Sequence, residues 1–234
     1  MKGWMEMINK ASEVQKLLEK TNAYEIFKKR HEVSIDYFVK KCNIPFIFID
    51  AKETDMKAEM IGALKVHQSY FITGGVGVGK THLAVALLRK YIATIKPCYD
   101  ERQKEYVYDV EKIKLPIFVE VPELLLRIRD TYRSRTGTYI DKGMETEKDI
   151  IDYYTTTPLL IIDDLGVEKV SDFSTLVIYL IINRRCTNRL TTIITSNLNL
   201  LGIGEHLSDR ISSRIKGMCK VIDMSGHDRR SKEG

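Results

Sequence analysis

A glycine-rich run occupies residues 74 to 81, which read GGVGVGKT. Glycines remove side chains and admit backbone angles that other residues avoid, so such a run can wrap closely around an anion. The spacing of Gly74, Gly79, Lys80 and Thr81 matches the phosphate-binding loop, in which backbone N–H groups, a helix N-terminus and a lysine hold phosphate oxygens. The expected phosphate-binding residues are Gly74, Gly75, Val76, Gly77, Val78, Gly79, Lys80, Thr81 and His82.

Two carboxylates follow the apolar run LLII of residues 159–162. If that run is a buried strand of a parallel sheet, Asp163 and Asp164 lie at the carboxyl edge of the sheet, where ligands bind in such folds. Asp163 is the natural partner of Thr81 in holding Mg²⁺, and Asp164 is then placed to orient an attacking water. The sequence therefore predicts a metal site at Thr81 and Asp163, beside the phosphate loop.

Polar residues later in the chain extend this chemistry. Asn197 follows the apolar stretch 191–195, and its amide can reach a terminal phosphate or the attacking water from the same sheet edge; a simple Ser-Asn turn is the alternative. Arg210 and Arg214 are four residues apart, so on a helix they would share one face. They are either solvated or project into the phosphate site of a neighbouring subunit, where an arginine stabilises developing charge.

Short strands and helices alternate around these residues. We expect strands at 69–73, 117–121, 159–162 and 191–195, and helices at 81–95, 122–132 and 171–185. Two of the strands are apolar throughout, which is typical of a parallel sheet covered on both faces. The pattern predicts an α/β fold in which helices flank a parallel sheet.

The composition is ordinary for a soluble globular protein, with 234 residues, 44% hydrophobic and 29% charged. No apolar run approaches the roughly 20 residues of a membrane-spanning helix, and no signal peptide opens the chain, so we expect a cytoplasmic protein without membrane contact. The four cysteines are far apart and form no metal or redox motif. The net charge of +5 permits an anionic partner such as nucleic acid but does not require one.

The chain divides into three parts by its patterning. We expect a helical N-terminal segment at 1–42, a partly charged linker at 43–66 and the main domain at 67–234. Trp4, Ile8 and Leu18 lie on an apolar stripe of the first part, which either packs on the chain's own core or docks on another protein. The charged, tyrosine-rich insertion 96–114 is expected to be a surface excursion.

Basic residues and tyrosines interleave between residues 124 and 142. Basic side chains neutralise phosphates, and tyrosines stack on the bases of a single strand. The alternative is a solvated helix end followed by a loose loop. The candidate DNA-binding residues are Arg127, Arg129, Arg133 and Arg135.

Four of these motifs together carry a family resemblance. GGVGVGKTHLA, LLIIDDLG, TIITSN and SDRISSRI, in this order, resemble the AAA+ ATPases of the DnaC/DnaI helicase-loader and IstB transposition-helper group. The resemblance covers about residues 44–230. It implies an AAA+ P-loop core with ATP and Mg²⁺ as cofactors. Only 20 residues follow Arg214, too few for the C-terminal helical lid of other AAA+ proteins, so a core without that lid is expected.

The resemblance also implies roles for residues of the nucleotide site. The run 74–81 resembles the Walker A motif, Asp163 and Asp164 resemble Walker B, and Asn197 matches sensor 1. Many AAA+ enzymes carry a glutamate where this chain has Asp164, whose side chain is one methylene shorter. This difference predicts slow ATP hydrolysis that DNA or a partner stimulates.

Three arginines complete the implied machinery. Arg214 matches the arginine finger, which acts in trans when subunits assemble, and Arg210 supports it. Arg230, in the tail GHDRR, matches sensor 2, with Arg229 as a register-shifted alternative.

The resemblance favours an ATP-dependent loader of the replicative DNA helicase. Such a protein assembles on ATP, binds single-stranded DNA, grips the helicase through its N-terminal segment and releases it on hydrolysis. An IstB-like helper of a transposase is the nearest alternative. A P-loop kinase of a small molecule and a non-hydrolysing nucleotide-gated adaptor are the others.

Overall fold

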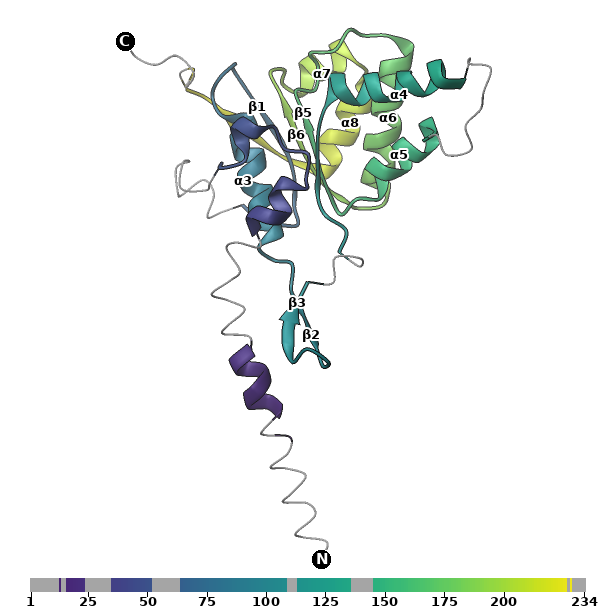
Figure 1. Cartoon of the computed structure of the whole chain (residues 1–234). Helices are drawn as coiled ribbons and strands as arrows, with labels where there is room; N and C mark the ends of the chain where they lie inside the picture. Colours follow the sequence, from purple (N-terminus) through teal and green to yellow (C-terminus); the bar gives the residue numbers. More distant parts are fainter. Residues whose placement is uncertain are drawn as a thin grey trace, which may run out of the picture.

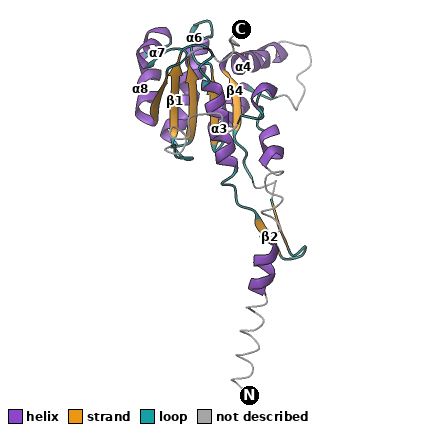
Figure 2. Ribbon diagram, turned by 90° about the vertical axis from the view of Figure 1, so that its left-hand side faces the viewer, coloured by secondary structure: helices purple, strands orange, loops and turns teal. Residues whose placement is uncertain are grey.

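A five-stranded parallel sheet forms the centre of the protein, with the strand order β4-β5-β6-β1-β7 (Figures 1 and 2). The computed structural model describes residues 13, 16–23, 35–51, 64–108, 113–135, 145–226 and 228. The strands of the sheet are β1 (Ser69–Gly74), β4 (Ile117–Glu120), β5 (Leu159–Asp163), β6 (Thr191–Ser196) and β7 (Cys219–Met224). Because all neighbouring strands are parallel, their carboxyl ends meet at one edge.

Helices cover both faces of the sheet. One face packs against α3 (Lys80–Ile92) and residues 35–51. The other packs against α4 (Val121–Arg135), α5 (Glu147–Thr156), α6 (Asp172–Thr187), α7 (Leu200–His206) and α8 (Asp209–Met218). Within β5, Leu159 and Ile161 join the first core and Leu160 and Ile162 the second. Burial on both sides explains why this strand is apolar throughout, and the predicted α/β fold is confirmed.

The segment before β1 is part of the first core. Phe38, Val39 and Cys42 are buried on the α3 face together with Ile44 and Ala51. Residues 44–51, expected as part of a linker, therefore lie on the body of the domain, with a short 3₁₀ helix at Phe46–Phe48. The division into a partner-binding segment, a linker and an ATPase domain stays a prediction.

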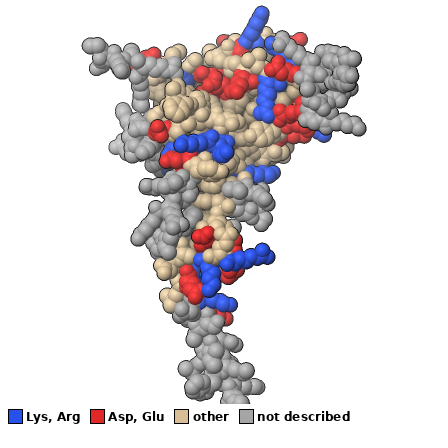
Figure 3. Space-filling view, in the orientation of Figure 1, with Lys and Arg blue, Asp and Glu red and all other residues tan. Residues whose placement is uncertain are grey.

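The insertion 96–114 contains a two-stranded hairpin of β2 (Cys98–Asp100) and β3 (Glu105–Val107), which projects from the body beside helical residues 16–23 (Figure 1). Lys20 Nζ lies 2.8 Å from Glu101 Oε1 across this contact. Leu18 is 60% exposed. Trp4 and Ile8 fall outside the described residues. We call the β2–β3 hairpin together with helical residues 16–23 the projecting arm. Basic and acidic side chains lie intermixed on this arm and in parts of the body above it, on the face drawn in Figure 3.

Within the described ranges, no helix is both long and apolar enough to span a membrane.

Candidate active site

The loop between β1 and α3 has the backbone that its glycines permit. Gly77 and Gly79 have φ angles of 75° and 99°, in the left-handed region that favours glycine. A β-carbon on Gly74 would overlap the main-chain carbonyl of Met224 in the neighbouring strand β7. The glycines are therefore required by the turn at Gly77 and Gly79 and by close packing at Gly74.

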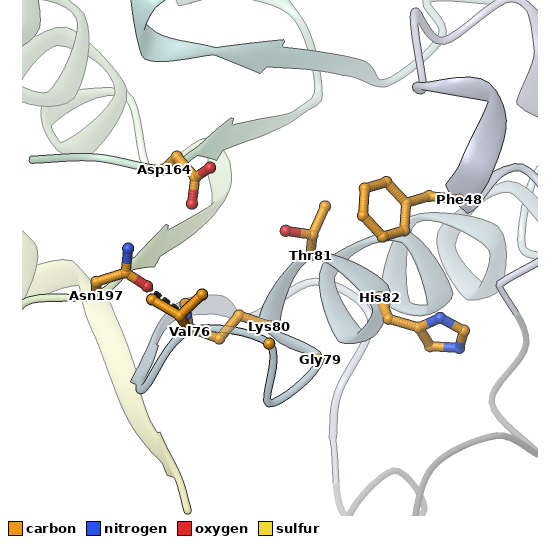
Figure 4. A pocket seen from close by; sticks show the side chains of 9 residues that line it. Phe48, Val76, Gly79, Lys80, Thr81, His82, Asp164 and Asn197 are labelled. Carbon is orange, nitrogen blue, oxygen red and sulfur yellow. Dashed lines mark hydrogen bonds between the residues drawn. The ribbon is translucent and has the colours of Figure 1, made fainter. Parts of the chain in front are cut away.

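Lys80 is buried at the start of α3, with 6% of its surface exposed. Its Nζ donates hydrogen bonds to the carbonyl oxygens of Gly74 and Gly75, at 3.1 and 2.7 Å. It also donates to Oδ1 of Asn197 at 2.6 Å, the bond drawn in Figure 4. The structure thus joins the lysine of the phosphate loop to the asparagine that follows β6.

Asp163, at the end of β5, is held by two hydroxyls. Thr195 Oγ1 donates to its Oδ1 at 2.6 Å, and Thr81 Oγ1 lies 3.1 Å from both carboxylate oxygens. Burial raises the pKa of Asp163 to about 6, and the charge of Asp164 acts in the same direction, whereas the hydrogen bonds from Thr195 and Thr81 oppose the rise. A cation bound beside this carboxylate would favour its ionised form.

Asp164 sits in a tight turn that β6 stabilises. Its φ angle is 57°, which is uncommon for a residue with a side chain. Its N–H donates to Thr195 Oγ1 at 2.9 Å, and the next N–H, of Leu165, donates to the Thr195 carbonyl at 2.9 Å. One threonine therefore fixes both Walker B acids, because its hydroxyl donates to Asp163 and accepts from the backbone of Asp164.

A pocket of about 210 Å³ opens between these residues. Asp164 and Asn197 lie on one side of it, and Phe48 and His82 on the other (Figure 4). Phe48 was not predicted from the sequence, because it stands in an apolar stretch, IPFIF, that carries no motif. Its half-buried ring reaches the pocket only because residues 44–51 pack on α3.

The chemistry of the donor set fits Mg²⁺, which prefers oxygen ligands and keeps several waters. Thr81 and Asp163 supply a hydroxyl and a carboxylate that already touch. In the described part of the chain, no cluster of three or more His, Cys, Asp or Glu residues could hold a metal alone. The remaining ligands would therefore come from phosphate oxygens and water.

Arg210 and Arg214 lie on α8 with exposed side chains, beside the row formed by the buried Ile211 and Ile215. Neither arginine belongs to the described lining of the pocket. Arg229 and Arg230 fall outside the described residues.

The candidate DNA-binding arginines lie on α4 in different settings. Arg127 forms a two-pronged ion pair with Glu145, with Nη2 2.7 Å from Oε1 and Nε 3.2 Å from Oε2. Arg129 is exposed. Arg133 and Arg135 belong to the last turn of α4. Glu145 therefore already neutralises the charge of Arg127.

Known proteins share parts of this sequence and this fold. No protein-family model matches the chain. In sequence it is similar to the replicative helicase loader DnaC of Escherichia coli K12, with 23% identity over 148 residues, which are 63% of this chain and 50% of that protein. The chain thus spans about half the length of the curated relatives that it first matches.

Solved structures share the fold. A crystal structure of the DnaC helicase loader superposes with a TM-score of 0.57 at 20% identity, over 77% of this chain and 100% of that one. DnaI gives 0.55 at 21% identity, over 79% and 96%. DnaA from Aquifex aeolicus, bound to AMPPCP, gives 0.51 at 19% identity, over 72% and 44%.

The parallel sheet, its strand order and the phosphate loop define a P-loop fold of the AAA+ type. Within that class, the resemblance to the DnaC and DnaI helicase loaders, predicted from the motifs, is confirmed by the sequence and structure matches.

Proposed function

We propose that this protein is an ATPase that loads the replicative DNA helicase. The observation that carries the ATPase part is the 2.6 Å contact between Lys80 and Asn197, which unites the phosphate loop and the end of β6 at one pocket. The loader part is supported by the similarity to proteins named replicative helicase loaders.

ATP binding would use the whole length of the pocket. Lys80 would exchange its carbonyl partners for phosphate oxygens, because a charged donor is better satisfied by an anion than by neutral oxygens. Phe48 and His82 present rings at the opposite side, where a nucleobase can stack. The pocket therefore suits a nucleoside triphosphate with its phosphates at the loop.

Hydrolysis would depend on the two Walker B acids and Asn197. Thr81 and Asp163 would hold Mg²⁺, which neutralises phosphate charge when bound. Asp164 would accept a hydrogen bond from the attacking water and orient it. Asn197, freed from Lys80 by the phosphates, would hold the same water or the terminal phosphate.

Assembly would complete the site. Arg214 is exposed on α8 and does not line the described pocket of its own chain, which supports an action on another subunit. An arginine that reaches a neighbour's phosphates would stabilise the charge that develops during transfer. Arg210, one turn earlier on the same face, would support it.

The proposal also assigns surfaces for DNA and for the helicase, away from the nucleotide pocket. Arg129, Arg133 and Arg135 on α4 would meet the phosphates of single-stranded DNA, with a smaller share for Arg127. Leu18, exposed on the projecting arm, would belong to the surface that grips the helicase.

The solution mass of the protein mixed with its host's replicative helicase, with and without ATP and Mg²⁺, tests the loader function. A joint complex is expected, and deletion of residues 1–34, which keeps the buried Phe38, Val39 and Cys42 in the core, is expected to abolish it. If no complex forms under any nucleotide condition, the loader function is wrong, and a transposase with duplex DNA is the next partner to examine.

Steady-state ATP turnover tests the enzymatic part separately. Lys80→Ala is expected to abolish turnover. Arg214→Ala should lower it at least tenfold while nucleotide binding persists, whereas Lys216→Ala, which removes another exposed cation of α8, should leave it near wild type. Equal turnover in Arg214→Ala and the wild type would refute the action in trans.

A further inference from the structure

The phosphate loop and the tail of the chain leave the sheet side by side. β1 and β7 are parallel neighbours, and Gly74 at the end of β1 pairs with Met224 at the end of β7. The loop follows β1 and the tail follows β7, so both emerge at the carboxyl edge. The residues from Met224 to Asp228 can span about 14 Å when extended, which is enough to reach across the loop.

Asp228, in the segment after β7, contacts the loop. A β-carbon built on Gly77 would overlap Oδ1 and Cγ of Asp228, so this carboxylate lies directly against the middle of the phosphate loop. Gly77 also lines the nucleotide pocket. The glycine at 77 thus serves both the left-handed turn and the approach of the tail.

A carboxylate at this position opposes the proposed ligand. The loop is built to receive phosphate oxygens, and two negative charges a few ångströms apart repel each other. Because Asp228 is exposed, water weakens this repulsion without removing it. Nucleotide affinity must therefore be lower with this carboxylate on the loop than without it.

We propose that Asp228 sets the nucleotide affinity of this protein: its carboxylate rests on the phosphate loop and competes with the nucleotide phosphates, so that ATP binding displaces this carboxylate from the loop. This inference rests on the proposed binding of ATP by the loop.

Titration with a fluorescent ATP analogue and Mg²⁺ tests the inference. Asp228→Asn is expected to raise the affinity by about threefold to tenfold, with a gain that shrinks as salt increases. Asp228→Ala should behave alike. Asp223→Asn makes the same change of charge at an exposed position on β7, opposite Thr73 and not against the loop, and should stay near wild type.

Unchanged affinity in both Asp228 variants would overturn the inference. An equal gain in Asp223→Asn would also overturn it, because the effect would then come from net charge and not from the contact. Lys80→Ala distinguishes a failure of the Asp228 inference from a failure of ATP binding by the loop. If the wild type binds ATP and Lys80→Ala does not, a failure at Asp228 concerns this inference alone; if the wild type binds no ATP, both fail.

Discussion

Replacement of Asp163 by asparagine should stabilise the nucleotide-free protein while it destroys the proposed metal site. Asp163 is 3% exposed, and its pKa is raised from 3.8 to about 6, first by burial and then by the charge of Asp164. Asparagine has the same shape. Its carbonyl oxygen can still accept from Thr195, and its amide can donate to Thr81 Oγ1.

The magnitude follows from the two pKa values. A difference of about two units corresponds to about 3 kcal/mol at 1.36 kcal/mol per unit, so we expect Asp163→Asn to gain about 2–3 kcal/mol in free energy of unfolding at pH 8. For a chain of this size, such a gain raises Tm by about 5–10 °C.

The sign of the pH dependence is fixed by which state binds the proton more tightly. Between pH 3.8 and about 6 the folded protein holds the proton on Asp163 and the unfolded chain does not, so wild-type stability falls as pH rises through this window. The destabilisation caused by the buried, ionised Asp163 carboxylate is fully present above pH 6. The advantage of the asparagine variant is therefore complete at pH 8 and lost as pH falls toward 4.

Thermal unfolding of both proteins in EDTA, at intervals from pH 4 to pH 8, measures this difference. Asp223→Asn, an exposed carboxylate on β7, serves as the control and should follow the wild type at every pH. Equal Tm values at pH 8, or a gain that persists unchanged at pH 4, would refute the reasoning from burial.

Three further predictions concern single side chains. Phe48→Ala should weaken nucleotide binding about fivefold in a fluorescence titration, through the loss of about 1 kcal/mol of stacking, whereas Phe48→Tyr should retain it. Arg185→Leu should lower the free energy of unfolding in urea by about 3 kcal/mol or more, because the buried guanidinium donates to three main-chain carbonyls and a threonine hydroxyl; Arg184→Leu, at a half-exposed ion pair, should cost less than about 1 kcal/mol. Gly74→Ala should lower Tm, since its β-carbon would overlap a carbonyl of β7, while Gly75→Ala meets only a side chain at 3.8 Å and should not. Similar losses in either matched pair would contradict the packing described.

Much of the site could be predicted because its chemistry depends on the residue types within short stretches of sequence. The positive φ angles at Gly77 and Gly79 favour glycine whatever surrounds the loop, and Lys80 and Thr81 directly after it supply the charge and the hydroxyl. The apolar run of β5 predicts a buried strand, and the end of that strand places Asp163 and Asp164 at the sheet edge. These inferences hold over a few residues, where backbone geometry and side-chain chemistry act directly.

Elements with weak local signals could not be predicted. β7 is an edge strand that exposes Lys220, Val221 and Asp223, so it lacks the apolar run that marks β5. Its place beside β1 depends on register along the whole strand. Helix α5 begins with a capping box at Thr146 and Asp149, a real local signal, but its polar composition hides its buried face.

By itself, the sequence determined the α/β class, the phosphate loop and the paired acids, because residue type and spacing suffice for each. Only the tertiary structure decided that Lys80 meets Asn197, that Phe48 lines the pocket and that Asp228 rests on Gly77. These contacts join residues far apart in the chain. They follow from the summed burial of many side chains and the strand order of the sheet, which no short stretch of sequence specifies.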